Sequence, residues 1–341
     1  MSNVETAPDE MVCGEQDVAP TESSAPASRE PVAVEILTPR EVPLGGPRAM
    51  TVRRTLPQRR RSLIGAWCFV DHYGPDDVGA TGGMDVAPHP HTGLATVSWL
   101  FTGEVEHRDS HGVHAIVRPG ELNLMTGGHG VCHSEVSTPD TTTLHGAQLW
   151  LALPDAHRDT PRSFAHHAPE PIDLGGAVVR VFLGELAGAA SPVPTFSPLL
   201  GAELVLAPRA TVTLDVEPTF EHGILLDTGA VRVGGTGVTP SEVAAAELGC
   251  LAPGPSRFEL TNEADIPARL LLLGGAPFGE QIVMWWNFVA RTHDEIVAFR
   301  ADWEDDPEGR FGHVTGYVGR DGGTARLHAP TLPNAIIKPR G

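Results

Sequence analysis

Short apolar segments separated by turn residues recur along most of the chain. The first series begins with LIGAWCFVDHYGP (63–75) and LATVSWLFTGEVEHRDS (94–110), and it continues to TLHGAQLWLALP (143–154). Glycine or proline interrupts these segments within about ten residues, a spacing typical of β-sandwiches and β-barrels. A second series of the same texture begins near residue 193 and includes ELVLAPRATVTLDVEP (203–218). The pattern therefore predicts an all-β protein with two β-domains of similar length.

One later segment has the period of a helix. THDEIVAFRADWEDD (292–306) places Ile296, Phe299 and Trp303 on one stripe, and Thr292 and Glu295 have the spacing of a capping box. We therefore expect a short C-terminal helix.

The chain divides into four expected parts. Its start is rich in Ala, Pro, Ser, Thr and Glu and has few large apolar residues, so too little surface can be buried there to offset the ordering entropy. The expected parts are a disordered acidic tail at 1–35, a first β-domain at 45–185, a second at 193–290, and the helix with an extended tail at 291–341.

Charge and cysteine usage narrow the classes of function. The chain has 24 Lys and Arg against 43 Asp and Glu, a formal net charge of −19, which disfavours direct contact with nucleic acid. Neither a signal peptide nor a membrane-spanning apolar run is evident. The four cysteines are far apart and form no CxxC pair, as in proteins of a reducing compartment. We expect a cytoplasmic monomer.

Two pairs of candidate metal ligands share the period of a β-strand. His89 and His91 in DVAPHPHTGL lie at i and i+2, and so do His133 and Glu135 in GHGVCHSEVS. Side chains at this spacing point to the same face of a strand. An isolated HxH is more often a surface or turn feature, so the second pair is essential to the interpretation. Three imidazole nitrogens and one carboxylate oxygen suit Fe, Mn, Ni, Cu or Zn and are too rich in nitrogen for Ca or Mg.

Other polar residues near these segments receive structural interpretations. Cys132 is adjacent to His133, so strand alternation should point its thiol away from a metal. His107, His111 and His114 are interpreted as residues that cap a turn or line the cavity rim. The basic cluster of Arg53, Arg54, Arg59, Arg60 and Arg61 is either a solvated loop neutralised by nearby carboxylates, which we favour, or a site for an anionic partner.

Several of these segments resemble the signature of the pirin family, within the cupin superfamily. The resemblance is carried by FVDHYGP, HPHTGLATVSW, GEVEHRDSHG and RPGELNLMTGGHGVCHSE, within roughly residues 50 to 150. GGAPFGEQIVMWWNFVARTHDEI is similar to the segment that closes the second pirin barrel, which extends the likeness to about residue 300.

The resemblance implies a fold and a ligand set. Pirins have two cupin barrels face to face, and the N-terminal barrel holds one metal, usually iron, through three His and one Glu. On this sequence those ligands are His89, His91, His133 and Glu135, with Fe(II) as the expected ion and Mn, Ni, Cu or Zn as alternatives. The second barrel has neither HxH nor HxE, because Glu221 and His222 are neighbours and face opposite sides, so we expect no metal there.

One departure from the cupin pattern concerns the metal cavity. The general cupin motif has a glutamate a few residues after its HxH, where this chain has Ala95. The metal-binding carboxylate of pirins comes from the later HxE, so the ligand set is complete. The expected effect of Ala95 is on the polarity of the cavity and hence on substrate choice.

Two functions follow from the resemblance. The first is a quercetin 2,3-dioxygenase-like enzyme, which binds a small aromatic flavonol and O2 and uses Glu135 as the base for the substrate hydroxyl. The second is an iron-containing, redox-responsive regulator that binds a transcription factor or a metabolic enzyme, with an exposed carboxylate ligand coupling the iron to a protein partner. We favour the enzyme, because open coordination positions require a ligand.

Overall fold

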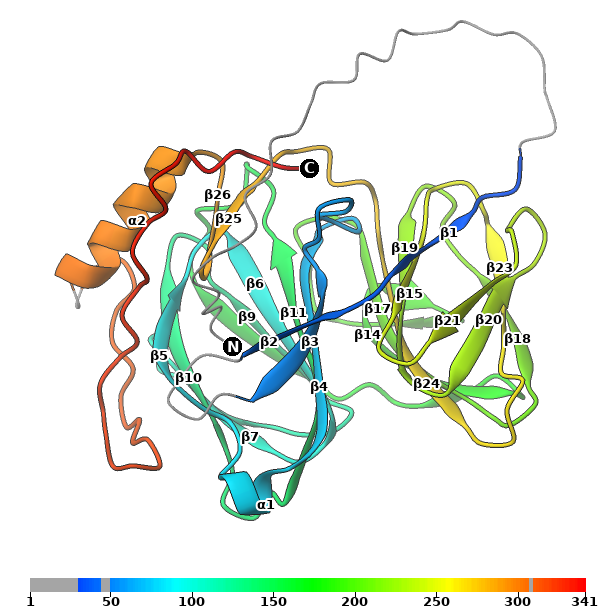
Figure 1. Cartoon of the computed structure of the whole chain (residues 1–341), viewed down its shortest axis with the longest axis horizontal. Helices are drawn as coiled ribbons and strands as arrows, with labels where there is room; N and C mark the ends of the chain where they lie inside the picture. The colour runs from blue at the N-terminus through cyan, green and yellow to red at the C-terminus, as the bar shows by residue number, and fades with distance from the viewer. Residues whose placement is uncertain (1–29, 44–49, 307–308) are drawn as a thin grey trace, which may run out of the picture.

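Two β-barrels lie side by side in the computed structural model, which describes residues 30–43, 50–306 and 309–341 (Figure 1). The expected all-β class with two cupin barrels is confirmed. Most of the expected acidic tail lies outside the described residues, and its last residues enter the first strand, β1 (Val34–Leu37). No helix in the described part of the chain is both long enough and apolar enough to cross a membrane.

The first barrel consists of a seven-stranded and a four-stranded antiparallel sheet. The larger sheet has the order β12-β9-β6-β11-β4-β3-β2, and its strands are β2 (Arg40–Pro43), β3 (Thr51–Leu56), β4 (Trp67–Asp77), β6 (Leu94–Thr102), β9 (Leu122–Thr126), β11 (Thr143–Ala152) and β12 (Ser163–His167). The smaller sheet has the order β5-β10-β7-β8, and its strands are β5 (Asp85–His91), β7 (Val105–Asp109), β8 (His114–Val117) and β10 (Val131–Ser137).

The second barrel repeats this arrangement. Its larger sheet has the order β1-β22-β19-β24-β17-β14-β13, with β13 (Ile172–Asp173), β14 (Ala177–Leu183), β17 (Leu199–Leu206), β19 (Glu221–Thr228), β22 (Leu248–Leu251) and β24 (Ala268–Gly275). Its smaller sheet has the order β18-β23-β20-β21, with β18 (Thr211–Asp215), β20 (Ala230–Gly234), β21 (Ser241–Ala244) and β23 (Arg257–Thr261).

The remaining elements are two hairpins and two helices. The hairpins are β15 (Glu185–Leu186) with β16 (Ala189–Ala190), and β25 (Val283–Trp285) with β26 (Phe288–Ala290). The helices are α1 (Val78–Thr81) and α2 (His293–Asp305). In α2 the Thr292 side chain accepts the N–H of Glu295, and the Glu295 carboxylate accepts the N–H of Thr292, so the predicted capping box is confirmed.

The second barrel includes strands from both sides of the first barrel in the sequence. β1 precedes the first barrel in sequence yet pairs with β22, with Val34 opposite Leu251. β14 follows the first barrel and pairs with β17 of the second. Strand pairing does not by itself define folding units, so the expected domain limits of 45–185 and 193–290 stay a prediction.

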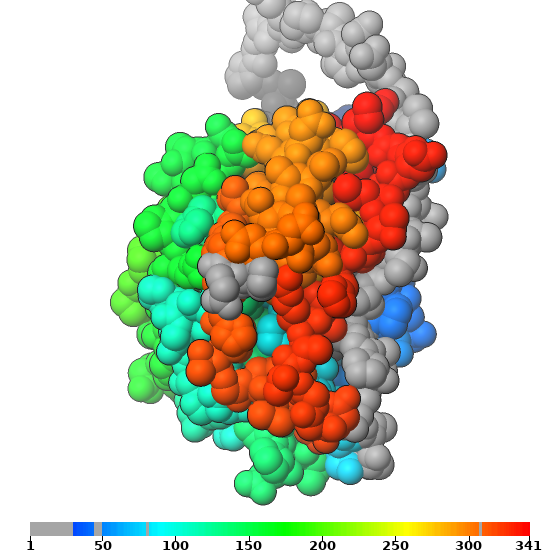
Figure 2. Space-filling model, turned by 90° about the vertical axis from the view of Figure 1, so that its left-hand side faces the viewer, coloured from blue at the N-terminus to red at the C-terminus, as the bar shows by residue number. Residues whose placement is uncertain are grey.

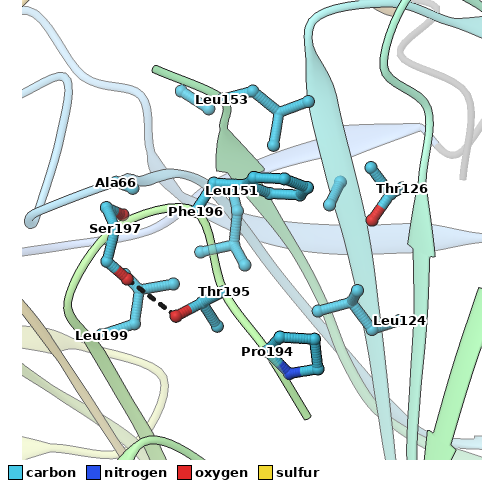
Figure 3. A pocket seen from close by; sticks show the side chains of 12 residues that line it. Ala66, Leu124, Thr126, Leu151, Leu153, Pro194, Thr195, Phe196, Ser197 and Leu199 are labelled. Carbon is cyan, nitrogen blue, oxygen red and sulfur yellow. Dashed lines mark hydrogen bonds between the residues drawn. The ribbon is translucent and has the colours of Figure 1, made fainter. Parts of the chain in front are cut away.

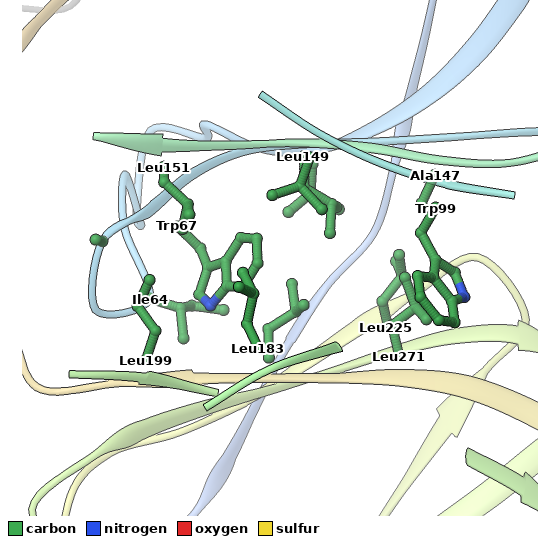
Figure 4. Packing of buried hydrophobic residues seen from close by; sticks show 14 of the residues in the cluster. Ile64, Trp67, Trp99, Ala147, Leu149, Leu151, Leu183, Leu199, Leu225 and Leu271 are labelled. Carbon is green, nitrogen blue, oxygen red and sulfur yellow. The ribbon is translucent and has the colours of Figure 1, made fainter. Parts of the chain in front are cut away.

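An apolar layer joins the two larger sheets face to face (Figure 4). Trp67 and Trp99 project from the first barrel onto leucines of the second, among them Leu225 and Leu271. The indole N–H of Trp67 donates to the carbonyl oxygens of Leu200 and Gly274, at 3.2 and 3.1 Å. Burial of such side chains is the dominant favourable contribution to folding, so this layer fixes the relative position of the barrels.

The structure corrects the expected role of Ala95. Side chains alternate along β6, and Ala95, Val97 and Trp99 all belong to the layer between the barrels. Ala95 lines a small pocket at the edge of that layer, beside Thr126 and Phe196, with space of ≈ 10 Å³, about one water molecule (Figure 3). It therefore faces away from the inside of the first barrel and does not set the polarity of the metal cavity.

A row of polar side chains crosses the inner face of the larger sheet in the first barrel. Strand pairing aligns one residue from each of five neighbouring strands, namely Arg54, Asp71, Gln148, Ser98 and Asn123. The Arg54 guanidinium donates to both carboxylate oxygens of Asp71 at 2.7 and 2.8 Å, and both side chains are buried. The interpretation of Arg54 as part of a solvated loop was wrong.

The C-terminal part of the chain covers the outer face of β5 and β10. Figure 2 shows α2 and the tail after it spread over this face. The backbone N–H of Leu327 donates to Pro88 O at 2.9 Å, and the Arg310 guanidinium donates to His129 O at 2.9 Å. Trp303 and Phe311 pack with Cys132 beneath this cover. The two strands that carry the predicted ligands thus have the barrel interior on one face and the C-terminal segment on the other.

Candidate metal centre

The four predicted ligands lie on two adjacent strands of the smaller sheet. β5 and β10 pair antiparallel with His133 opposite His89, and a bulge separates His133 from Glu135 in this pairing. On its other side β10 pairs with β7, with His133 opposite Asp109 and Glu135 opposite His107. Because alternate residues share a face, these side chains all project to the inside of the first barrel.

The three predicted histidines meet at one point. The ligand atoms of His89, His91 and His133 all lie within 4.8 Å of one another, and each side chain is 0% exposed. His91 Nε2 and His133 Nε2 are 3.1 Å apart, and His89 Nε2 is buried without a hydrogen-bond partner. A buried nitrogen without a partner is costly, so this convergence fits a shared cation.

The opposite ring nitrogens have the partners that metal-binding histidines need. His89 Nδ1 lies 2.9 Å from the carbonyl oxygen of Ala87, and His91 Nδ1 lies 3.2 Å from that of Asn287, which precedes β26. A carbonyl oxygen only accepts, so both Nδ1 atoms carry the proton and both Nε2 lone pairs face the centre. This donor set can hold a divalent transition metal.

Burial keeps the three imidazoles neutral. It lowers the pKa of His89, His91 and His133 well below the usual value for histidine, and the proximity of the rings to one another adds to the effect for His89 and His133. A neutral imidazole has the free lone pair that a metal requires, so the site is ready to bind at neutral pH.

Glu135 belongs to a second group of ligand atoms, which shares only His133 with the three-histidine group. Its carboxylate and the ligand atoms of His107 and His133 are all within 4.8 Å of one another. Glu135 is only 2% exposed, and together with burial its charge raises the pKa of the nearby Tyr73 phenol. An exposed carboxylate was expected to couple the iron to a protein partner, and this buried position contradicts that expectation.

His107 is a residue of the site that the sequence interpretation missed. It was expected at a turn or at the cavity rim, but it lies in β7, is 3% exposed, and its Nδ1 is 3.3 Å from Nδ1 of His133. The available signal was the alternation of His107 and Asp109, which matches that of the ligand pairs. His111 does lie in the turn between β7 and β8, and His114 is the first residue of β8. Both are exposed.

The expected orientation of Cys132 is confirmed. Cys132 points away from the three histidines, and its thiol donates to Gly312 O at 3.3 Å under the C-terminal cover. Burial raises its pKa to about 11, so it stays a thiol. Cys68, Cys132 and Cys250 are free and buried, and Cys13 lies outside the described residues.

A third group of ligand-type atoms joins the two barrels. His72 Nε2 and His145 Nε2, from the first barrel, lie 2.7 and 2.5 Å from Asp227 Oδ1 on β19 of the second. The Arg53 guanidinium lies 3.2 Å from His72 Nδ1, and Arg269 donates to Asp227 Oδ2 at 2.6 Å. Arginine only donates, so His72 Nδ1 accepts and its Nε2 carries the proton. That proton occupies the position a metal would need, so the group is a hydrogen-bonded connection.

This connection should weaken in acid. Burial, with the neighbouring charges of Arg53 and His145, lowers the pKa of His72, and the hydrogen bond to Asp227 only partly opposes this effect. The unfolded chain therefore binds a proton that the folded protein does not, and stability falls as the pH drops below about 6.5. We expect His72 to account for at most about 2 kcal/mol of the loss between pH 7 and pH 5.

Urea unfolding at both pH values tests this expectation. The His72→Gln variant removes the titrating group and should lose less stability than the unaltered protein over the same interval. His114→Gln, at an exposed ring, is the matched control. Equal losses in the His72→Gln variant and the unaltered protein would contradict the prediction.

Comparison with known proteins agrees with the fold. The family model for pirin matches residues 49–151, and the model for the pirin C-terminal cupin domain matches residues 201–312. A Pseudomonas aeruginosa protein provisionally named a quercetin 2,3-dioxygenase is 43% identical over 298 residues, covering 87% of this chain and 90% of the relative. A pirin-like protein of Caulobacter vibrioides is 36% identical over 263 residues, covering 74% of this chain and 88% of the relative.

A solved structure gives the same result. The crystal structure of a quercetin 2,3-dioxygenase from Acinetobacter baumannii is 37% identical to this chain and superimposes with a TM-score of 0.81, covering 90% of this chain and 97% of that one. The family models, the relatives and the two paired barrels all point to the same family. The chain belongs to the pirin family.

Proposed function

We propose that the protein is a metal-dependent dioxygenase that opens a flavonol-like, quercetin-type substrate with O2. The site consists of His89, His91, His133 and Glu135, with Fe(II) as the expected ion and Mn, Ni, Cu or Zn as alternatives. The observation that carries the proposal is the convergence of three buried, neutral imidazoles on one point. The similarity to the quercetin 2,3-dioxygenase of Acinetobacter baumannii supports the reaction type.

The wall next to the histidines supports an aromatic substrate. A cross-strand row of the larger sheet carries Phe69, Trp150, Thr96, Met125 and Phe164. Phe69 and Trp150 stack with ring centroids 4.0 Å apart, and Trp150 meets His91 edge-on at 5.2 Å. Aromatic side chains in this wall would favour an aromatic substrate.

Unpaired donors on the same inner face support a substrate rich in oxygen atoms. Trp150 Nε1, Gln148 Nε2 and Asn123 Nδ2 are buried and have no hydrogen-bond partner. Each can donate to a hydroxyl or carbonyl oxygen of a polyphenol, which would offset the cost of burying these groups.

Glu135 is the proposed base, supported by the closeness of its carboxylate to the ligand atom of His133. When bound, the metal supplies Lewis acidity, which lowers the pKa of a substrate hydroxyl. The buried Glu135 carboxylate would accept the proton of that hydroxyl at one of its oxygens. Glu135 is only 2% exposed, which would limit exchange of that proton with water.

Turnover with defined metals tests this function. Metal-free protein is loaded separately with Fe(II), Mn(II), Ni(II), Cu(II) or Zn(II), and quercetin is added in air. We expect loss of the flavonol absorbance with matched uptake of O2 and release of carbon monoxide for at least one metal, and none for the metal-free protein. Full loading with every metal and no turnover would contradict the proposal.

A further inference from the structure

We propose that Asp109 and His107 position the ligand His133 by fixing which of its ring nitrogens carries the proton. The inference rests on the metal centre proposed above and concerns residues outside the expected ligand set. In this arrangement Asp109 acts through His107, and His107 acts through His133, so both are positioning residues.

The three ligand histidines differ in what holds their outer ring nitrogen. His89 and His91 use the carbonyl oxygens of Ala87 and Asn287, which are backbone groups that no side-chain substitution removes. His133 uses the imidazole of His107, with the two Nδ1 atoms 3.3 Å apart. An imidazole nitrogen can accept or donate, so this contact alone does not fix the proton on His133.

Asp109 removes that ambiguity. Its Oδ1 accepts the backbone N–H groups of His111 and Val113 at 2.9 and 3.0 Å, and its Oδ2 lies 3.2 Å from His107 Nε2. A carboxylate only accepts, so the proton of His107 is on Nε2 and its Nδ1 presents a lone pair. His133 must then donate from Nδ1, which leaves its Nε2 lone pair directed at His89 and His91.

Burial and a rigid turn hold the hydrogen-bonded series Asp109–His107–His133 in place. His107 and Asp109 are each 3% exposed, so water does not replace either partner. The turn after β7 holds Asp109 through its own N–H, which donates to Val113 O at 3.0 Å, and the next residue, Ser110, donates to Cys132 O at 2.8 Å. The carboxylate thus has a fixed position relative to the ligand strand β10.

The Asp109→Asn variant is the direct test. The amide oxygen can keep the two backbone N–H groups of the turn, but its NH2 group then faces His107 Nε2. His107 Nε2 would then have to accept a hydrogen bond, which moves the proton of His107 to Nδ1. That proton would face the proton that a metal-binding His133 carries on its own Nδ1. We expect metal affinity to fall by about 10–100-fold, the cost usual for lost outer-shell partners, in a competition titration of Ni(II) or Co(II) against a chromophoric chelator. The visible spectrum of the Co(II) form should change as well.

A rescue variant separates this effect from general damage. His107→Gln places a carbonyl oxygen that can accept from His133 Nδ1 without help from Asp109. Metal affinity in the Asp109→Asn/His107→Gln double variant should therefore return toward that of His107→Gln alone. His114→Gln, at an exposed ring near the same turn, should bind metal like the unaltered protein.

Three outcomes bear on the inference. Unchanged affinity and an unchanged Co(II) spectrum in Asp109→Asn would overturn it. A loss in His107→Gln as large as in His133→Ala would also overturn it, because His107 would then be a metal ligand itself. A loss in Asp109→Asn that the double variant recovers would support it, even if no metal form of the unaltered protein turned over quercetin. That last result would reject the proposed function and leave the positioning role intact.

Discussion

The His133→Ala variant is expected to lose metal binding and flavonol turnover together. His133 is the residue shared by both groups of ligand atoms, those with His89 and His91 and those with His107 and Glu135. Its removal leaves two imidazoles in the first group. Loss of outer-shell partners alone costs about 10–100-fold in metal affinity. Loss of this ligand should therefore exceed about 100-fold.

Metal content after purification and a chelator titration measure the effect. Circular dichroism should show the same β-structure, because the substitution leaves the backbone pairing of β10 with β5 and β7 intact. His114→Ala, on an exposed ring that contacts Glu106, should retain both metal and turnover. A His133→Ala protein that retains stoichiometric metal would show that the three imidazoles are not the binding site.

The Arg54→Met variant is expected to destabilise the first barrel by about 3–5 kcal/mol, the usual cost of removing one partner from a buried ion pair. Arg54 and Asp71 are 2% and 0% exposed, and the guanidinium also lies 4.3 Å from the ring centroid of Phe69. Methionine fills much of the same volume but cannot donate. The Asp71 carboxylate would then remain buried without the two charged hydrogen bonds that offset its loss of hydration.

The chain contains a matched control for this experiment. Arg209 and Asp265 form the same kind of bidentate ion pair on the surface, with hydrogen bonds of 2.7 and 2.8 Å. Arg209→Met should leave the urea-unfolding curve almost unchanged, since solvent-exposed ion pairs contribute little. The Arg54→Met/Asp71→Leu double variant should recover most of the lost stability. If Arg54→Met costs no more than Arg209→Met, the buried pair is not important for stability.

Local periodicity was sufficient to predict the all-β class and the strand face on which the candidate ligand residues lie. The period of two placed His89 with His91, and His133 with Glu135, on single strand faces, and the structure brings the three imidazoles together. The capping box of Thr292 and Glu295 defined the start of α2. Each of these predictions depends only on residues within a few positions of one another.

The errors concern features that depend on pairing between distant strands. Arg54 belongs to a basic run, and nothing local shows that Asp71 lies opposite it on the next strand of the sheet. His107 precedes a glycine-containing turn, and its place beside Glu135 is set by the register between β7 and β10. Ala95 lies one position from the inner face, so a single step of the strand alternation decides which side it lines.

The pairing of β1 with β22 has a consequence for synthesis on the ribosome. Val34 leaves the ribosome long before its partner Leu251, and β1 lies on the outer edge of a sheet whose other strands are all made later. The strands of the first barrel can pair with one another while β1 is still unpaired and exposed, because its partner in the second barrel has not yet been made. The earliest described strand of the chain therefore cannot pair until β22 of the second barrel has been synthesised.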